Sequence, residues 1–150
     1  MIAPMTHPGP QFGIPLPGVT YRYRPGAYAV IQGENGLIAF VPGPPGRLGL
    51  PGGGVDDGET ADAALLREII EEIGWEARLL GPAGHATQYL PREGEGYVAV
   101  LATYFRAELT ARRTGICEHE VLWHTLAEVA PMLAREADVW AVSEVLKLAD

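Results

Sequence analysis

Apolar residues recur at intervals of three and four between residues 60 and 74, which is the periodicity of one face of an α-helix. Thr60 is suited to cap the first turn, and Asp62 places a negative charge where the helix dipole favours it. Gly74 can end the helix in a left-handed conformation. We therefore predict a helix over residues 60–74 with a buried stripe made of Leu65, Leu66, Ile69, Ile70 and Ile73.

Elsewhere the apolar positions form short runs, which are typical of strands. Residues 27–32 and 37–41 are two such runs, and the pair Asn35 and Gly36 between them favours a tight β-hairpin. A short strand is also expected at residues 48–50, inside a segment dense in proline and glycine. Further strands are expected at residues 76–81, 84–90, 97–109 and 120–126, followed by a short helix within 127–136 and an amphipathic helix over 138–149.

This order of elements places strands on both sides of one central helix and ends in a second long helix. It predicts an α/β (α+β) fold in which helices sandwich a mixed sheet. Residues 1–18 contain five prolines and three glycines. We expect them to form a flexible, extended arm that can carry a short strand or pack on a neighbour, ahead of one folded domain over residues 19–150.

Composition narrows the possible partners. The 150 residues carry a formal net charge of −8, which does not suit coating nucleic-acid backbone but leaves room for one nucleotide. Cys117 is the single cysteine, so an oxidising compartment is not implied. No run reaches the ~20 apolar residues of a membrane span, and a signal-peptide layout is missing. We therefore expect a cytoplasmic protein that binds neither a nucleic-acid polymer nor a membrane.

Three glutamates of the predicted helix, Glu68, Glu71 and Glu72, are neighbours on the face opposite the apolar stripe. Like charges at this spacing destabilise a helix by about 0.2–0.5 kcal/mol per pair. An ordinary solvated face, or partners for arginines such as Arg67, would explain them without any function. However, the three glycines at residues 52–54 allow backbone to approach a ligand just before the helix. Carboxylates beside such a loop favour a site for Mg²⁺, which prefers oxygen ligands.

Residues 53–75, GGVDDGETADAALLREIIEEIGW, hold these features at fixed spacing. The constrained positions are Gly53, Glu59, Arg67, Glu68, Ile69, Glu71, Glu72 and Gly74. Their order resembles the Nudix box of the Nudix hydrolases at every specified position, apart from Trp75, where an aliphatic residue is usual. The resemblance implies a Nudix-type α/β/α sandwich and a MutT-like pyrophosphohydrolase that uses Mg²⁺ or Mn²⁺.

The resemblance also assigns roles inside the box. It implies that Glu68, Glu71 and Glu72 hold the metal ions, although it leaves open which of them serves instead as the base. A backbone carbonyl, of Gly52 or of Gly53, is expected to add a metal ligand. These residues are the expected metal site and the core of the expected catalytic site.

Other roles implied by the resemblance concern the surroundings of the metal. Arg67 is expected to orient Glu71 or its neighbours, and Glu59 to hold the loop to the helix. Family members often supply another carboxylate from a loop downstream, for which Glu118 and Glu120 are the candidates. We prefer Glu120 as a catalytic and metal-binding residue because it adjoins the strand expected at residues 120–126.

Substrate choice is encoded less clearly. Tyr89 and Arg92 are candidates for substrate binding, as an aromatic platform and a phosphate-binding guanidinium. Residues 118–142 are loosely similar to the end of small Nudix proteins that hydrolyse nucleoside triphosphates or 8-oxo-dGTP. We expect a nucleoside triphosphate to be cleaved to monophosphate and pyrophosphate. The alternatives are an ADP-ribose, nucleotide-sugar or dinucleoside polyphosphate pyrophosphatase, or a nucleotide-sensing module without catalysis. The apolar arm leaves a homodimer open.

Overall fold

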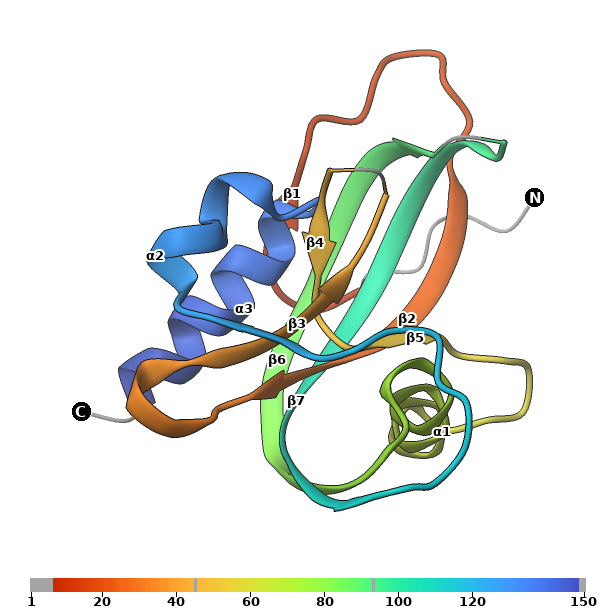
Figure 1. Cartoon of the computed structure of the whole chain (residues 1–150). Helices are drawn as coiled ribbons and strands as arrows, with labels where there is room; N and C mark the ends of the chain where they lie inside the picture. Colours follow the sequence, from red (N-terminus) through yellow and green to blue (C-terminus); the bar gives the residue numbers. More distant parts are fainter. Residues whose placement is uncertain (1–6, 45, 93, 149–150) are drawn as a thin grey trace.

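The computed structural model describes residues 7–44, 46–92 and 94–148, and a five-stranded mixed sheet forms its centre (Figure 1). The strands are β1 (Gln11–Phe12), β2 (Arg22–Ile31), β5 (Gly52–Gly54), β6 (Trp75–Arg92) and β7 (Gly96–Arg112). They lie in the order β1–β6–β7–β2–β5. β1 is parallel to β6 and β2 is parallel to β7, whereas the pairs β6–β7 and β2–β5 are antiparallel.

A smaller antiparallel sheet packs beside the first one. It consists of β4 (Leu48–Gly49), β3 (Ile38–Pro42) and β8 (Leu122–His124), in that order. The helices are α1 (Ala61–Ile73), α2 (Leu126–Val129) and α3 (Glu136–Leu148), with 3₁₀ turns at Glu34–Gly36 and Ala130–Met132. In the described residues, no helix is long and apolar enough to cross a bilayer.

The two faces of the large sheet carry separate cores, as the alternation of side chains along a strand requires. One set of β2 residues packs against α1, in a core that contains Ala27, Ala29, Ile31, Leu65, Ile69 and Ile73. The alternate set packs against α3, in a core that contains Tyr28, Val30, Val142 and Val145. Helices therefore cover both faces of a mixed sheet (Figure 1), and the predicted α/β/α sandwich is confirmed.

Helix α1 begins and ends where the sequence predicts. The Thr60 hydroxyl accepts a hydrogen bond from the Ala63 N–H at 3.2 Å, and Gly74 adopts a left-handed φ of 73°. Leu65, Ile69 and Ile73 are buried, as predicted, while Leu66 and Ile70 are only half-buried. The buried stripe is narrower than expected, because the helix lies across one sheet face and leaves its flanks partly open.

The prediction of a hairpin at Asn35 and Gly36 is wrong in its strand pairing. Both residues have positive φ values, 56° and 76°, as a tight turn of this type requires. The flanking strands β2 and β3 nevertheless enter different sheets and share only the bridge between Gln32 and Ile38. β7 pairs with one edge of β2 along its length and β5 pairs with residues 26–28 of the other edge, whereas β3 pairs with β4 and β8.

Strand β6 joins two predicted strands into one. The segments expected at 76–81 and 84–90 form a single strand of 18 residues, paired throughout with β7. Register shifts between Leu79 and Gly81 and between Pro82 and Gly84 accommodate Gly81 and Pro82 within the continuous strand.

The second half of the predicted arm contributes to the sheet. Gln11 and Phe12 pair with Thr87 and Gln88 of β6, and a ring nitrogen of His7 lies 2.8 Å from the Ala102 carbonyl oxygen. A short strand was one of the two options that the sequence left open. Residues 1–6 lie outside the described residues, so the expectation for that part stays a prediction, as does a domain boundary at residue 19.

Candidate functional site

The carboxylate face of α1 lies against the glycine strand β5. Burial of Leu65 and Ile69 fixes the rotation of the helix, so that Glu68 and Glu72 point to β5. The Gly52 N–H donates to Glu72 Oε1 at 3.0 Å. At Gly53 an added Cβ would lie only 2.6 Å from the Glu68 carboxylate carbon. The predicted meeting of glycine loop and glutamates is therefore present, and Gly53 leaves the space that Glu68 occupies.

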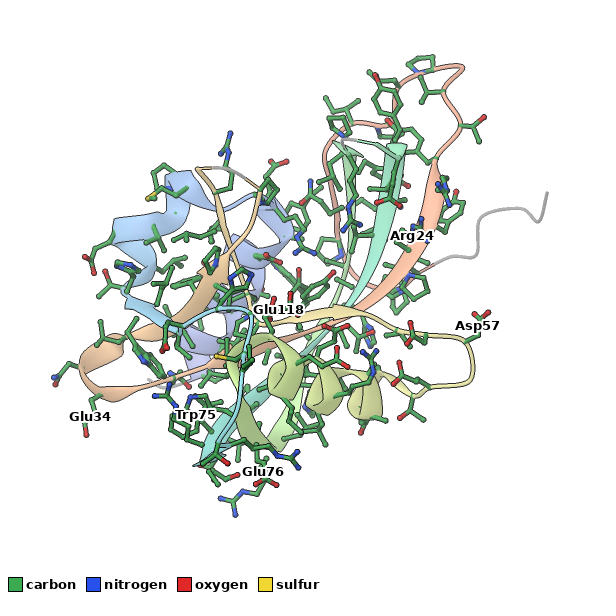
Figure 2. The ribbon with its side chains drawn as sticks, turned by 45° about the vertical axis from the view of Figure 1, so that its right-hand side comes forward. Arg24, Glu34, Asp57, Trp75, Glu76 and Glu118 are labelled. Carbon is green, nitrogen blue, oxygen red and sulfur yellow. The ribbon has the colours of Figure 1, made fainter. Side chains whose placement is uncertain are left out.

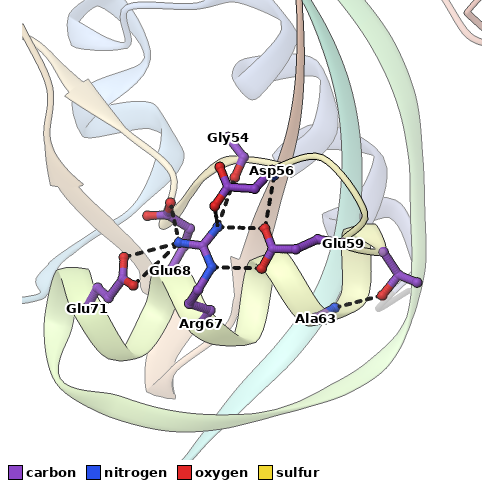
Figure 3. A network of polar contacts seen from close by, with 8 residues as sticks. Gly54, Asp56, Glu59, Ala63, Arg67, Glu68 and Glu71 are labelled. Carbon is purple, nitrogen blue, oxygen red and sulfur yellow. Dashed lines mark hydrogen bonds and ion pairs between the residues drawn. The ribbon is translucent and has the colours of Figure 1, made fainter.

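A single guanidinium organises this carboxylate face (Figure 3). Arg67 donates from Nε and Nη2 to the two Glu59 oxygens, each at 2.8 Å, which is a bidentate pair. Its Nη1 donates to Glu68 at 3.1 Å and to Glu71 at 3.2 Å. Its Nη2 also donates to the Gly54 carbonyl oxygen at 3.3 Å. Arg67 thus links the loop that enters the helix to two carboxylates of the helix.

The Arg67 bonds have an electrostatic consequence for the loop. Hydrogen bonds from Arg67, and then the Asp56 backbone N–H, lower the pKa of Glu59 to about 2. Glu59 therefore stays ionised at neutral pH. The family resemblance implied that Glu59 holds the loop to the helix, and the geometry of the pair is consistent with that role.

The two inner carboxylates behave in the opposite way. Burial, reinforced by the charges of Glu68 and Glu118, raises the pKa of Glu72 to about 7, against the Gly52 N–H and Arg135, which lower it. Burial is also the main cause that raises the pKa of Glu68. Both carboxyl groups therefore hold a proton to higher pH than a freely solvated glutamate does.

The loop between β7 and β8 brings a fourth carboxylate to this group. The His119 N–H donates to the Glu72 carbonyl oxygen at 2.8 Å, so the loop is attached to the last turn of α1. The charge of Glu118 raises the pKa of both Glu68 and Glu72, and Figure 2 shows Glu118 above α1. Glu120, which the sequence preferred, is exposed and pairs instead with Arg112 at 3.4 Å. The geometry therefore favours Glu118, the other residue that the sequence offered.

Tyr89 and Arg92, the predicted substrate-binding residues, are not brought to the carboxylates. They lie near the end of β6 that is remote from α1 (Figure 1). Arg92 pairs with Glu95 of the same hairpin at 3.1 Å, and the Tyr89 ring packs edge-on against Tyr21. In this arrangement they belong to a surface separate from the carboxylate face.

Sequence reasoning missed Arg135. This residue precedes α3, and its charge acts on Glu72, although more than 60 residues separate the two in the chain. No periodicity or spacing marks it, because its position depends on a bridge between Leu48 of β4 and Leu133. A contact of this kind becomes visible only in three dimensions.

The chemistry of these donors fits a divalent cation. The carboxylates supply hard oxygen ligands, and their mutual repulsion is only partly relieved by Arg67 and by one backbone N–H. Within the described residues, no three His, Cys, Asp or Glu side chains converge into a ready-made metal cage. The site therefore has the ligands and the excess charge for a cation, while its carboxylates stand apart.

Comparison with known proteins identifies the domain. A model of the NUDIX domain matches residues 22–144. This chain belongs to the Nudix family. The Nudix domain is 36% identical over 107 residues to the Mycobacterium tuberculosis protein named "Putative 8-oxo-dGTP diphosphatase 2". The match covers 69% of this chain and 73% of that protein.

Two further comparisons extend this result. A Bacillus subtilis protein named "Putative 8-oxo-dGTP diphosphatase" is 41% identical over 63 residues, 41% of this chain and 42% of its own length. The matched segment thus covers less than half of either protein. The MutT protein of Methanosarcina mazei has the same fold, with a TM-score of 0.68 at 22% identity over 89% of this chain and 99% of its own. Family and fold therefore agree, and the chain is an enzyme of the type that acts on phosphoanhydride bonds.

Proposed function

We propose that this Nudix domain hydrolyses a nucleoside triphosphate, of the 8-oxo-dGTP type in the first instance, to a nucleoside monophosphate and pyrophosphate. The observation that carries the proposal is the packing of the Glu68 and Glu72 carboxylates against the glycine strand β5, with Arg67 hydrogen-bonded to Glu68. A triphosphate is itself highly charged, so a site rich in carboxylates can accept it only together with cations.

We assign the metal ligands to Glu68, Glu71, Glu72 and Glu118, with a carbonyl of Gly52 as a further candidate. Glu120 is not included, since its carboxylate is engaged by Arg112. Bound Mg²⁺ or Mn²⁺ would neutralise phosphate oxygens and lower the pKa of a bound water.

The protein's own groups have distinct tasks in this proposal. Arg67 restrains Glu68 and Glu71 through bonds of 3.1 and 3.2 Å, so their oxygens are held in place before substrate arrives. Gly52 holds one oxygen of Glu72 with its N–H and leaves the second oxygen available. One of these carboxylates takes up the proton of the attacking water.

The substrate assignment rests on the relatives. Both bacterial relatives described above carry 8-oxo-dGTP diphosphatase in their names, and one of them matches about two thirds of this chain. ADP-ribose, nucleotide sugars and dinucleoside polyphosphates remain the alternatives within the same chemistry. A sensing module without catalysis is disfavoured because Glu68, Glu71 and Glu72 are all present on α1.

The proposal is tested by measuring products over a panel of substrates. Purified protein is incubated with 8-oxo-dGTP, the common nucleoside triphosphates, ADP-ribose, a nucleotide sugar and a dinucleoside polyphosphate, with Mg²⁺ or Mn²⁺. We expect pyrophosphate and monophosphate from a triphosphate, highest kcat/KM for the oxidised one, and no turnover with a chelator. Faster cleavage of ADP-ribose than of every triphosphate would overturn the substrate assignment. Tight binding without turnover would favour the sensing module.

A further inference from the structure

Arg135 is a largely buried cation next to the candidate site but on another part of the fold. Its side chain is 19% exposed. Leu133 bridges to Leu48, and the Ala134 N–H donates to the Leu48 carbonyl oxygen at 3.0 Å. Arg135 is the next residue, so this backbone pairing places it beside Gly49. An ideal Cβ on Gly49 would lie 3.8 Å from Arg135 Nη2.

Two groups fix the guanidinium in one orientation. Its carbon lies 4.3 Å from the centre of the Tyr28 ring, which is a stacked cation–π contact. Its Nε lies 3.6 Å from Asp138 Oδ2, an oxygen that is buried and has no hydrogen-bond partner in the described part of the chain. Asp138 Oδ1 is held in turn by the Tyr104 hydroxyl at 2.8 Å. The Nε edge therefore faces α3, and Nη2 faces β4.

The position of Tyr28 connects this cation to the carboxylates. Tyr28 is the register partner of Gly52, and the Gly52 N–H holds Glu72. Through its contact with Tyr28, the Arg135 guanidinium therefore lies one register pair away from the backbone N–H that holds Glu72. A fixed cation is thus present on the Tyr28 side of β5, and the carboxylates of α1 are on the other.

We propose that Arg135 binds the phosphate chain of the substrate, as a specificity-determining contact for nucleotides with several phosphates. The inference rests on the proposed function and names a residue of the same site. A guanidinium suits phosphate because its planar donors match two oxygens at once. The anchor on Asp138 and the stack on Tyr28 hold it ready, so little side-chain entropy is lost when phosphate binds.

The experiment compares Arg135→Lys and Arg135→Gln with the wild type. Arg135→Lys keeps a positive charge that can pair with the buried Asp138. It therefore still tests the proposal if Arg135→Gln fails to fold. Calorimetry gives Kd for an α,β-methylene nucleoside triphosphate and for the matching monophosphate, with Mg²⁺ present. We expect Kd for the triphosphate analogue to rise about 10-fold in Arg135→Lys and more in Arg135→Gln. Kd for the monophosphate should change less than about threefold.

Arg78→Lys is the matched control, because Arg78 forms an exposed pair with Glu108 on the sheet. It should leave both Kd values unchanged. A purely structural Arg135 would lower the melting temperature and weaken both ligands alike, and that result would overturn the proposal. An unchanged Kd for the triphosphate analogue, or no binding of it by the wild type, would also overturn it. Wild type that binds the analogue but cleaves no triphosphate would defeat only the proposed function.

Discussion

Glu72 has two opposing requirements placed on it. Packing of α1 against β5 removes it from water, yet its proposed task is to carry a negative charge. We predict that Glu72→Gln raises the free energy of unfolding of the metal-free protein at pH 8 by about 1–2 kcal/mol. A neutral amide needs less hydration than a carboxylate, and it relieves the repulsion from Glu68. The Gly52 N–H can still donate a hydrogen bond to the amide oxygen of the substituted side chain. Chemical denaturation with and without chelator measures the change.

The same substitution should remove activity while it stabilises the fold. We expect kcat to fall by about 100-fold or more, since a proposed metal ligand is lost. Near-wild-type kcat in a folded Glu72→Gln protein would defeat the assignment of Glu72 to the metal site.

Glu118 and Glu120 form a natural pair of test residues, separated by one position. Glu118 acts on Glu68 and Glu72, whereas Glu120 pairs with Arg112 on the surface. We predict that Glu118→Gln lowers kcat/KM by about 10–100-fold and that Glu120→Gln changes it less than about twofold. Steady-state assays at equal Mg²⁺ measure both. The reverse ranking would restore the preference that the sequence alone suggested.

At the scale of elements, the glycine strand and the helix must approach closely. An added Cβ at Gly53 would collide with the Glu68 carboxylate, whereas one at Gly54 would meet nothing within 4 Å. We predict that Gly53→Ala lowers kcat by about 100-fold, because it displaces a carboxylate by the order of an ångström. Gly54→Ala is the matched control and should stay close to wild type. Equal kcat values for the two variants would contradict a precise role for β5.

How far the sequence predicts an element depends on where the determining contacts lie. Thr60 and Gly74 act on their own helix, so both ends of α1 could be predicted. Asn35 and Gly36 determine a turn but not the partners of the strands that it joins. Those partners, β7 and β5, come from residues that are distant in the chain. Local chemistry therefore predicted the turn correctly, while its strand pairing was wrong.

The same distinction applies to the candidate site. The box residues lie on one helix and the loop before it, so their meeting follows from helical spacing. Glu118 and Arg135 reach the site through backbone bonds to other elements, from His119 to Glu72 and from Ala134 to Leu48. Spacing in the sequence carries no signal for such bonds, which explains why Glu120 was preferred and Arg135 was missed.

At the scale of the whole molecule, Glu72 links stability to pH. Its pKa is about 7 in the folded protein and about 4.5 in the unfolded chain, so the folded state binds more protons between these values. Its contribution is therefore complete below about pH 4.5 and is lost as the pH rises through 7. We predict that the metal-free melting temperature of wild type, relative to Glu72→Gln, falls between pH 5 and 8. Scanning calorimetry with chelator measures this difference.

Saturating Mg²⁺ should reverse that trend. A cation binds the ionised carboxylate, so its stabilisation of the fold grows as the proton leaves Glu72. The gap in melting temperature between loaded and chelated wild type should widen from pH 5 to 8. A gap that is independent of pH would show that Glu72 does not couple protons to metal binding.

The short strand β1 bears on how the molecule behaves in a crowded solution. It pairs with residues 87 and 88, in the second half of the outer side of an 18-residue strand. An uncovered strand of that length is a template onto which another chain can add. Register shifts and Pro82 interrupt the first part of β6, and Pro91 lies near its end. β1 pairs within the regular stretch between them, so Gln11 and Phe12 occupy backbone groups of β6 to which a second chain could otherwise add.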